Sequence, residues 1–163
     1  MHYSTTTTNG LPTYKDEPYL ITVYDKDKVK EDVNRLRDKV DLLIVAMHWG
    51  EEYTATPVQE QKEIANYLAS LGVNLIIGHH PHVIEPVEFI GDTMVVYSLG
   101  NLVSAQQGID RLSGLMVSVN IKKVTENGKS KIEFEDAKSI ITYTYADSSP
   151  YRHNYKLYLL YFH

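Results

Sequence analysis

Two short apolar runs, each preceded by a helical pattern, constrain the fold of this chain most strongly. The runs are residues 42–47 and 73–77, which suit strands buried on both faces. The helical pattern before the first run starts near Asp25, and its apolar residues recur at spacings of four, three and four: Val29, Val33, Leu36 and Val40. This alternation of helix and buried strand favours an α/β fold.

The second helix is expected to open at residues 56–59. Thr56 is a suitable N-cap, Pro57 suits the first helical position, and Gln59 would complete a capping box. The apolar stripe of this helix lies further along, at Ile64, Leu68 and Leu71. Gly72 follows at the C′ position, so the helix is expected to end there.

The rest of the chain is predicted to be mostly β. Residues 83–90 and 93–97 indicate a hairpin around Gly91-Asp92, and 115–123 and 132–145 indicate another around 126–129. The last segment, 151–163, is rich in Tyr and Leu and is expected to cover a sheet edge or face. We therefore expect one domain over 1–163, with an N-terminal loop or edge segment (1–24), an α/β core (25–105) and a β-rich extension (106–163).

Composition excludes several classes of protein. The 163 residues suit one domain, and 16 basic against 21 acidic residues give a net charge of −5, which disfavours nucleic-acid binding. The absence of cysteine excludes disulfides and thiolate zinc sites. No apolar stretch approaches the roughly 20 residues of a transmembrane helix. One basic cluster, for which a solvated face is the default interpretation, consists of Lys122, Lys123, Lys129 and Lys131.

Polar side chains follow each of the three predicted core strands. In open α/β sheets, functional sites gather at the carboxyl ends of strands. Imidazole is the usual ligand of borderline divalent metals, and an asparagine oxygen can add a ligand or orient a phosphate. A site for metal or phosphate is therefore predicted from the residues at these ends, which are His48, then His79, His80 and His82, then Ser98 and Asn101.

Neighbouring residues complete this site only in part. Glu51 and Glu52 follow His48, and one of them can face the site to orient a ligand or act as a base. Ser98 has no Gly-x-Ser-x-Gly elbow, which argues against a serine hydrolase, and Trp49 is interpreted as packing. Two-metal hydrolytic centres bridge their ions with carboxylates, and no such carboxylate stands at a suitable spacing here. The residues alone predict part of a metal site.

The motifs resemble the C-terminal part of the bacterial capsule synthesis (CapA, or PGA_cap) family. The resemblance runs from about residue 8 to 118 and becomes thin after Val119. The residues that carry it are Asn9-Gly10 with Pro12, Asp41, His48-Trp49-Gly50-Glu51-Glu52-Tyr53, Pro57, Gln61, residues 72–78 followed by His79-His80-Pro81-His82-Val83, and Tyr97-Ser98-Leu99-Gly100-Asn101-Leu102.

The resemblance implies a calcineurin-like metallophosphatase fold, an α/β/β/α sandwich of which this chain would be the C-terminal half. By position, His48 resembles a metal ligand and His80 and His82 resemble a His-x-His pair, with His79 as the alternative partner of His82. Glu52 and Asn101 resemble residues that line or support the site. The implied cofactor is a divalent metal (Mn, Zn or Fe), and the candidate catalytic groups are His48, His80 and Glu52.

The implied function is the biosynthesis or export of a capsular polymer, poly-γ-glutamate, at the cell surface, by a membrane-anchored parent protein. The expected partners are the polyanion or other capsule-synthesis proteins, together with a second copy paired through an exposed sheet edge. Two alternatives are a metal-dependent phosphoesterase in the full-length protein and a non-catalytic interaction scaffold. Family segments that would complete the site precede the matching region, so this chain alone is expected to be inactive.

Overall fold

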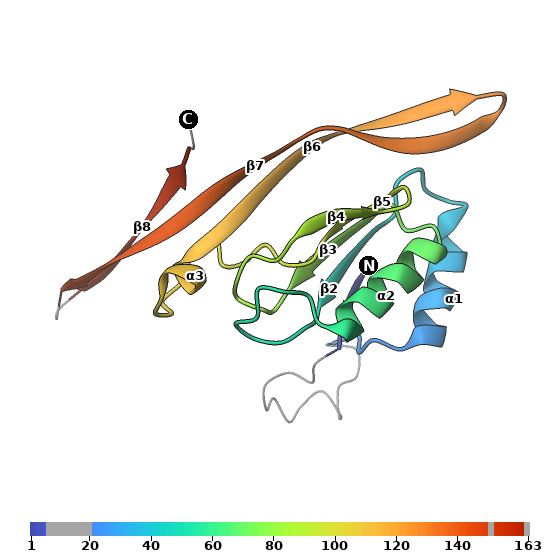
Figure 1. The fold of residues 1–163 in the computed structure, drawn as a ribbon. Helices are drawn as coiled ribbons and strands as arrows, with labels where there is room; N and C mark the ends of the chain where they lie inside the picture. Colours follow the sequence, from blue (N-terminus) through green and yellow to red (C-terminus); the bar gives the residue numbers. More distant parts are fainter. Residues whose placement is uncertain (6–20, 150–151, 162–163) are drawn as a thin grey trace.

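The computed structural model describes residues 1–5, 21–149 and 152–161, and shows a helix-covered sheet followed by a long antiparallel ribbon (Figure 1). Asn9, Gly10 and Pro12 lie outside the described residues. The elements are β1 (His2–Ser4), α1 (Lys26–Arg37), β2 (Ile44–His48), α2 (Gln59–Ser70), β3 (Leu75–His79), β4 (Val87–Ile90), β5 (Thr93–Val96), α3 (Ile109–Leu112), β6 (Ser113–Glu126), β7 (Lys129–Ser149) and β8 (Arg152–Leu160).

The first sheet has five strands in the order β1-β2-β3-β5-β4. The first four strands of that order are parallel, and β4 runs antiparallel to β5. The register pairs His48 of β2 with His79 of β3, so these two strands end at the same level. The second sheet, β6-β7-β8, is antiparallel throughout. The predicted α/β fold with a β-rich extension is confirmed.

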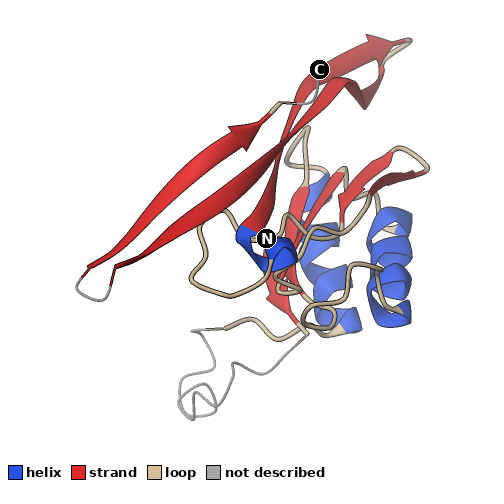
Figure 2. Cartoon of the chain, turned by 60° about the vertical axis from the view of Figure 1, so that its left-hand side comes forward, coloured by secondary structure: helices blue, strands red, loops and turns tan. Residues whose placement is uncertain are grey.

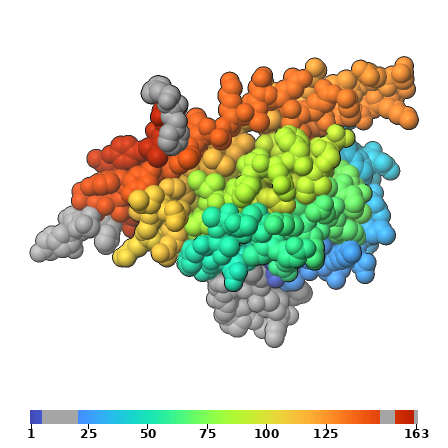
Figure 3. All heavy atoms as spheres, in the orientation of Figure 1, coloured from blue at the N-terminus to red at the C-terminus, as the bar shows by residue number. Residues whose placement is uncertain are grey.

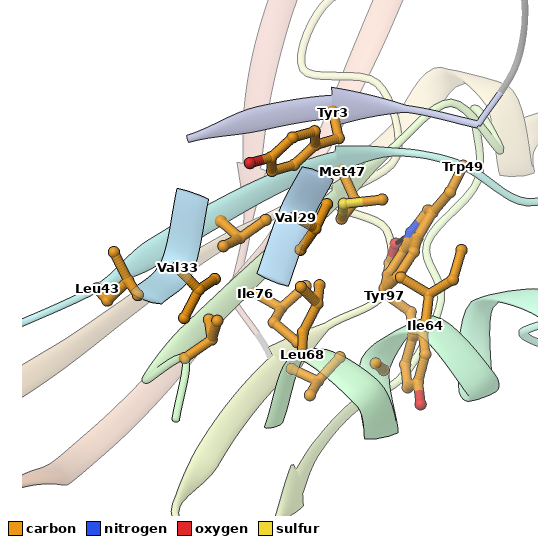
Figure 4. Close-up of a cluster of buried hydrophobic side chains, with 14 residues drawn as sticks. Tyr3, Val29, Val33, Leu43, Met47, Trp49, Ile64, Leu68, Ile76 and Tyr97 are labelled. Carbon is orange, nitrogen blue, oxygen red and sulfur yellow. Dashed lines mark hydrogen bonds between the residues drawn. The ribbon is translucent and has the colours of Figure 1, made fainter. Parts of the chain in front are cut away.

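Both long helices cover one face of the first sheet (Figures 1 and 2). Val29 and Val33 of α1, with Leu68 of α2, are fully buried against the sheet. Figure 4 shows these side chains pointing toward Met47 and Ile76 of the central strands. This core fixes one side of the sheet, as the apolar periodicity of the two helices predicts.

The predicted start of α1 is confirmed, because the Asp25 carboxylate accepts a hydrogen bond from the Lys28 backbone at 2.8 Å. The helix ends at Arg37, so Val40, expected on its apolar face, lies beyond it and is exposed. The helix is thus about one turn shorter at its C-terminal end than the apolar pattern predicts. Asp38 occupies the C-cap position, with a backbone N–H that still points back into the helix.

The predicted N-terminus of α2 is wrong by two residues. Val58 is the N-cap, in place of Thr56, and Pro57 stands outside the helix. Gln61, in place of Gln59, accepts the hydrogen bond from the Val58 backbone at 2.8 Å. Gln61 is favoured because it is fully buried and also donates to Glu85 at 2.8 Å. A tertiary contact therefore selects which glutamine closes the helix.

The predicted turns are confirmed. Gly72 follows α2 with a φ of +82°, a left-handed conformation that suits glycine. Gly91 and Asp92 join β4 to β5, and Asn127 and Gly128 join β6 to β7 with φ values of 51° and 77°. Positive φ at both central residues is the signature of a type I′ hairpin turn.

Two elements, β1 and α3, were not expected. β1 adds a parallel edge strand to β2 within the segment that was predicted to be a loop or edge. The C-terminal segment forms β8, which pairs along the outer edge of β7, as the expectation of edge coverage requires. Among the helices of the described residues, none is both long and apolar enough to cross a membrane.

The β6–β7 ribbon crosses the face of the first sheet that the helices leave open (Figure 2), and extends beyond it (Figure 3). Val117, Val119 and Phe134 of the ribbon pack on Met94 and Val96 of the sheet. A groove of about 420 Å³, with mostly apolar lining, remains between the sheet and β6.

Candidate functional site

Three imidazoles converge at the carboxyl ends of β2 and β3. His48 is the last residue of β2, and His80 and His82 lie in the loop that follows β3. The ring centroids of His48 and His80 are 4.6 Å apart, and those of His80 and His82 are 6.2 Å apart. The rule that polar residues at strand ends meet at one sheet edge therefore holds for these three residues.

His79 points elsewhere. It is the last residue of β3 and lines the apolar groove with Leu75 and Ile77, because alternate residues of a strand face the same side. The strand ends at His79, and the turn that follows directs His80 toward His48. Of the two adjacent histidines, His80 is thus the neighbour of His48 and His82. The metal-ligand role of all four histidines stays a prediction.

The loops that carry these rings hold an unusual backbone. Tyr53, His80 and His82 have φ values of 65°, 107° and 61°, which side-chain-bearing residues rarely adopt. Main-chain hydrogen bonds join the two loops, from Trp49 N to His79 O at 3.0 Å and from Tyr53 N to Pro81 O at 2.7 Å. Such strained residues cluster at functional sites, where the surrounding structure holds them.

Asn101 fixes the proton position on His82. The Asn101 amide nitrogen donates to the carbonyl oxygens of His82, at 3.2 Å, and Arg111, at 2.9 Å. Its amide oxygen therefore faces His82 Nδ1, at 2.9 Å. Because that oxygen only accepts, Nδ1 carries the hydrogen and Nε2 keeps its lone pair. This is the orientation that a histidine needs to bind a metal or accept a proton at Nε2.

The electrostatics keep two of the rings neutral. Burial lowers the pKa of His48, and the positive charges that His80 and other nearby histidines would carry lower it further. Burial also lowers the pKa of His80, although the exposed carboxylate of Glu52 acts in the opposite direction. Both imidazoles are therefore neutral at pH 7, with a lone pair available. Glu52 thus acts on His80 electrostatically, and its role in orienting a ligand or acting as a base stays a prediction.

Ser98 supports the site rather than lining it. Its side chain is buried, and its hydroxyl donates to the Val83 carbonyl at 2.7 Å while accepting from the Gly100 backbone at 3.2 Å. The hydroxyl is thus engaged on both sides and holds the loop after β3 against the loop after β5. The prediction that Ser98 lines the site is corrected accordingly.

Gly78 of β3 lies close to the backbone of Tyr97, the residue that follows β5. A methyl group at Gly78 would lie 1.8 Å from the Tyr97 carbonyl oxygen and 2.5 Å from Trp49 Nε1. Trp49 is fully buried and donates to that same carbonyl at 2.9 Å (Figure 4). The packing interpretation of Trp49 is confirmed, and the packing fixes the point from which the histidine loop departs.

Two site residues were missed. The Tyr53 ring lies 6.1 Å from the His82 ring, and the guanidinium carbon of Arg111 lies 4.7 Å from the Tyr53 ring centroid. Tyr53 belongs to the motif after His48, which gave a signal for it. Arg111 lies in the short helix α3, just before β6, and belongs to no motif, so only the tertiary structure reveals it.

The donor chemistry of the site suits a divalent metal, but the described residues do not complete a metal centre. Neutral imidazoles are the preferred ligands of zinc and related ions. Over residues 1–5, 21–149 and 152–161, no group of three or more His, Asp or Glu side chains has the arrangement to hold a metal ion. Metal binding by His48, His80 and His82 stays a prediction.

The lysine cluster is largely paired with acids. Lys122 faces Glu135 at 3.3 Å, Lys123 faces Asp41 at 2.6 Å, and Lys131 faces Glu133 at 2.6 Å. These exposed pairs match the interpretation of a solvated face. The basic patch predicted from the sequence is thus balanced by carboxylates, which weakens its attraction for a polyanion.

Comparison with known proteins identifies the family. PGA biosynthesis protein CapA of Bacillus subtilis (strain 168) is 35% identical over 101 residues, which are 62% of this chain and 26% of that protein. Capsule biosynthesis protein CapA of Bacillus anthracis is 32% identical over 101 residues, 60% of this chain and 24% of that protein. A probable polyglutamine synthesis accessory protein, MT0602, of Mycobacterium tuberculosis (strain CDC 1551 / Oshkosh) is 29% identical over 69 residues, 42% of this chain and 18% of that protein.

The chain spans about a quarter of the length of the two CapA relatives. The family model described as bacterial capsule synthesis protein PGA_cap matches residues 2–106, so the match starts before and ends earlier than the range expected from the motifs. It includes both histidine loops and Asn101, and excludes β6, β7 and β8. Because this match covers more than half of the chain, the chain belongs to the bacterial capsule synthesis PGA_cap family.

Proposed function

We propose that the protein to which this chain belongs acts in the biosynthesis or export of a poly-γ-glutamate capsule at the cell surface, and that the histidine site is its functional centre. The observation that carries the proposal is the family match over residues 2–106, which includes both histidine loops. Two relatives are named for PGA or capsule biosynthesis, and a third for polyglutamine synthesis. The expected partners are the polymer or other capsule-synthesis proteins.

A metallophosphatase-like architecture and a membrane-anchored parent are parts of this proposal. The five-stranded sheet with both long helices on one face would form one half of an α/β/β/α sandwich. Pairing of two copies through a free sheet edge also belongs to the proposal, because open edges attract further strands. A strictly monomeric species in light scattering at high protein concentration would contradict the pairing.

The test uses the full-length protein in its own cells. Deletion of the gene, followed by complementation with wild type or with His80→Ala/His82→Ala, is read out as the amount of polymer on the cell surface. We expect the double variant to lose the polymer, because two of the three converging rings are removed. Asn154→Ala, at an exposed position of β8, is the control and should restore it. Normal polymer with the double variant at normal protein levels would favour a non-catalytic scaffold.

A metal-dependent phosphoesterase is the second candidate function. The observation that favours it is the set of neighbouring imidazoles, with Nε2 of His82 free to bind. His48, His80 and His82 would hold the ion with further ligands from elsewhere, and a bound ion would supply Lewis-acid activation of a phosphate ester.

Calorimetric titration tests this second candidate on the chain itself. Manganese and zinc are titrated at about pH 7.5, above the ordinary histidine pKa of about 6.5, so that the imidazoles are neutral. Binding that His80→Ala/His82→Ala abolishes would support it. Turnover of a generic phosphodiester by the full-length protein, lost on His80→Ala, would establish hydrolysis. An absence of turnover in the metal-loaded full-length protein would exclude that reaction.

A further inference from the structure

Arg111 is connected to the histidine site through both its main chain and its side chain. Its carbonyl oxygen accepts a hydrogen bond from Asn101, which also orients His82. Its guanidinium carbon lies 4.7 Å from the centroid of the Tyr53 ring, and that ring lies 6.1 Å from the His82 ring. The two connections place a cation against the Tyr53 ring, at the edge of the histidine site.

The charge of Arg111 is not neutralised by its neighbours. Within the described ranges of the chain, no carboxylate lies at ion-pair distance from it and its guanidinium donates no hydrogen bond. An arginine keeps its positive charge throughout the physiological pH range. Arg111 therefore gives the edge of the site a permanent positive charge.

The geometry of this arginine suits an oxyanion. A guanidinium that lies against an aromatic ring still has N–H groups along its edge that can donate to a ligand. Two parallel N–H groups match the two oxygens of a carboxylate, or two oxygens of a phosphate. The Gln106 side chain also contacts Tyr53, because its amide Nε2 lies 3.5 Å from the Tyr53 hydroxyl oxygen.

We propose that Arg111 binds an oxyanion of the substrate at the edge of the histidine site, and that this oxyanion is a carboxylate of an acidic polymer. The choice of a carboxylate over a phosphate rests on the proposed function, whereas the oxyanion site rests on the contacts of Arg111 alone. With a net charge of −5, the chain as a whole repels a polyanion. The fixed positive charge of Arg111 would reduce that repulsion locally, at the edge of the histidine site.

Binding of two anions to the purified chain tests the proposal. A short γ-linked glutamate oligomer and inorganic phosphate are titrated separately at equal ionic strength, by calorimetry and by the NMR shift of arginine Nε–H groups. For Arg111→Met we expect the oligomer to bind about tenfold more weakly or worse, because a charge-assisted bidentate contact is lost. Arg111→Lys should fall between, since an ammonium keeps the charge without the fork.

The matched control is Arg35→Met, which removes the same charge from an exposed position on α1, where Arg35 pairs with Asp32. This variant should bind the oligomer like the wild type. Thermal unfolding of all variants establishes that they fold. Equal affinity of Arg111→Met and wild type, an equal loss in Arg35→Met, or no binding of either anion by the wild type would overturn the proposal.

Two further outcomes separate the claims. Binding of phosphate alone, lost in Arg111→Met, would overturn the carboxylate assignment. In the cellular assay, normal polymer with Arg111→Met but none with His80→Ala/His82→Ala would overturn the role of Arg111 and leave the proposed function standing. Loss of polymer with both variants, together with weakened oligomer binding, supports both.

Discussion

The first sheet and the β6-β7-β8 sheet solve the problem of stability in different ways. In the first sheet, the central strands carry fully buried side chains such as Val45, Met47 and Ile76. Among the described residues of the second sheet, only Gly114, Thr142 and Thr144 are buried. The first sheet is therefore held mainly by burial. The second is held by cross-strand pairing, by one tight turn and by the packing of Val117, Val119 and Phe134 on the first sheet.

The same division separates the family match from the rest of the chain. The match covers the first sheet and ends at residue 106, before β6 begins. The two regions meet beside the histidine site, where Gly114 packs against the Asn101 backbone and the Ser104 backbone donates to Thr144 at 3.3 Å. The buried region, around the first sheet, therefore builds the histidine site, and the exposed β6-β7-β8 region borders it.

The largest expected difference comes from truncating a leucine in each region. Leu68→Ala, in the core between α2 and the sheet, should lower the free energy of unfolding by about 3 kcal/mol, because it leaves a cavity at a fully buried position. Leu157→Ala in β8, where the side chain is 42% exposed, should change it by less than about 0.5 kcal/mol. Urea unfolding measures both. Similar losses of unfolding free energy in the two variants would show that Leu157 is covered in solution, by a partner or by another segment of the chain.

Gly78→Ala tests the close contact between Gly78 and the Tyr97 backbone. The added methyl group would overlap the Tyr97 carbonyl, which is main chain and cannot rotate away, so we expect a loss of about 2–3 kcal/mol. Gly91→Asn is the control, since nothing lies within 4 Å of a Cβ there and asparagine tolerates its positive φ. Chemical denaturation measures the loss. A Gly78→Ala protein as stable as the control would contradict the observed spacing.

Asn101→Ala tests the junction between the two regions. The carbonyls of His82 and Arg111 would lose their donor, which should cost about 2 kcal/mol of unfolding free energy. His82 should also lose its preference for a proton on Nδ1, which ¹⁵N NMR of the imidazole reports directly. Asn120→Ala, at an exposed hydrogen bond to Asp136, is the matched control. An unchanged His82 tautomer in Asn101→Ala would contradict the assignment made from this network.

The smallest effect is expected at Glu85, whose side chain is buried with Oε1 unpartnered. Burial raises the pKa of Glu85, and the hydrogen bond from Gln61 offsets part of that rise. The unfolded chain therefore releases this proton at lower pH than the folded chain. The contribution of Glu85 to folded stability is consequently complete below pH 4.5 and falls as the pH rises toward the folded pKa.

Glu85→Gln removes this titration while keeping an acceptor for Gln61. At pH 7.5 we expect the variant to be more stable than the wild type, and the difference to shrink toward pH 4. Thermal unfolding across this pH range measures it, with Glu31→Gln on the exposed face of α1 as control. A difference that grows toward low pH would show that the direction of the pKa shift is reversed.

Much of the fold could be predicted because local signals and burial agree. The apolar runs gave β2 and β3, the periodic valines gave α1, and Asn127-Gly128 gave the long hairpin. β1 could not be predicted, because three residues without periodicity become a strand only by pairing with β2. The start of α2 was misplaced because the deciding contact, between Gln61 and Glu85, spans 24 residues of sequence.

The sequence was enough to predict which loops meet at the site, but not which side chains face one another there. Strand ends and histidines were enough to bring His48 to the loop after β3. Which of His79 and His80 faces His48 depends on the residue at which β3 ends, and a shift of one residue reverses the side. Arg111 could not be predicted, because its contacts with Tyr53 and Asn101 arise only when α3 packs on the loops.

The contact between Gly78 and the Tyr97 backbone limits how far β3 can move relative to the residue after β5. A side chain in the gap could change rotamer, but here Gly78 faces the main-chain carbonyl of Tyr97 directly, next to the indole nitrogen of Trp49. Because His80 lies two residues beyond Gly78, this contact restricts where the histidine loop begins. The surface loop that carries His80 and His82 therefore starts at a backbone position with little room to shift.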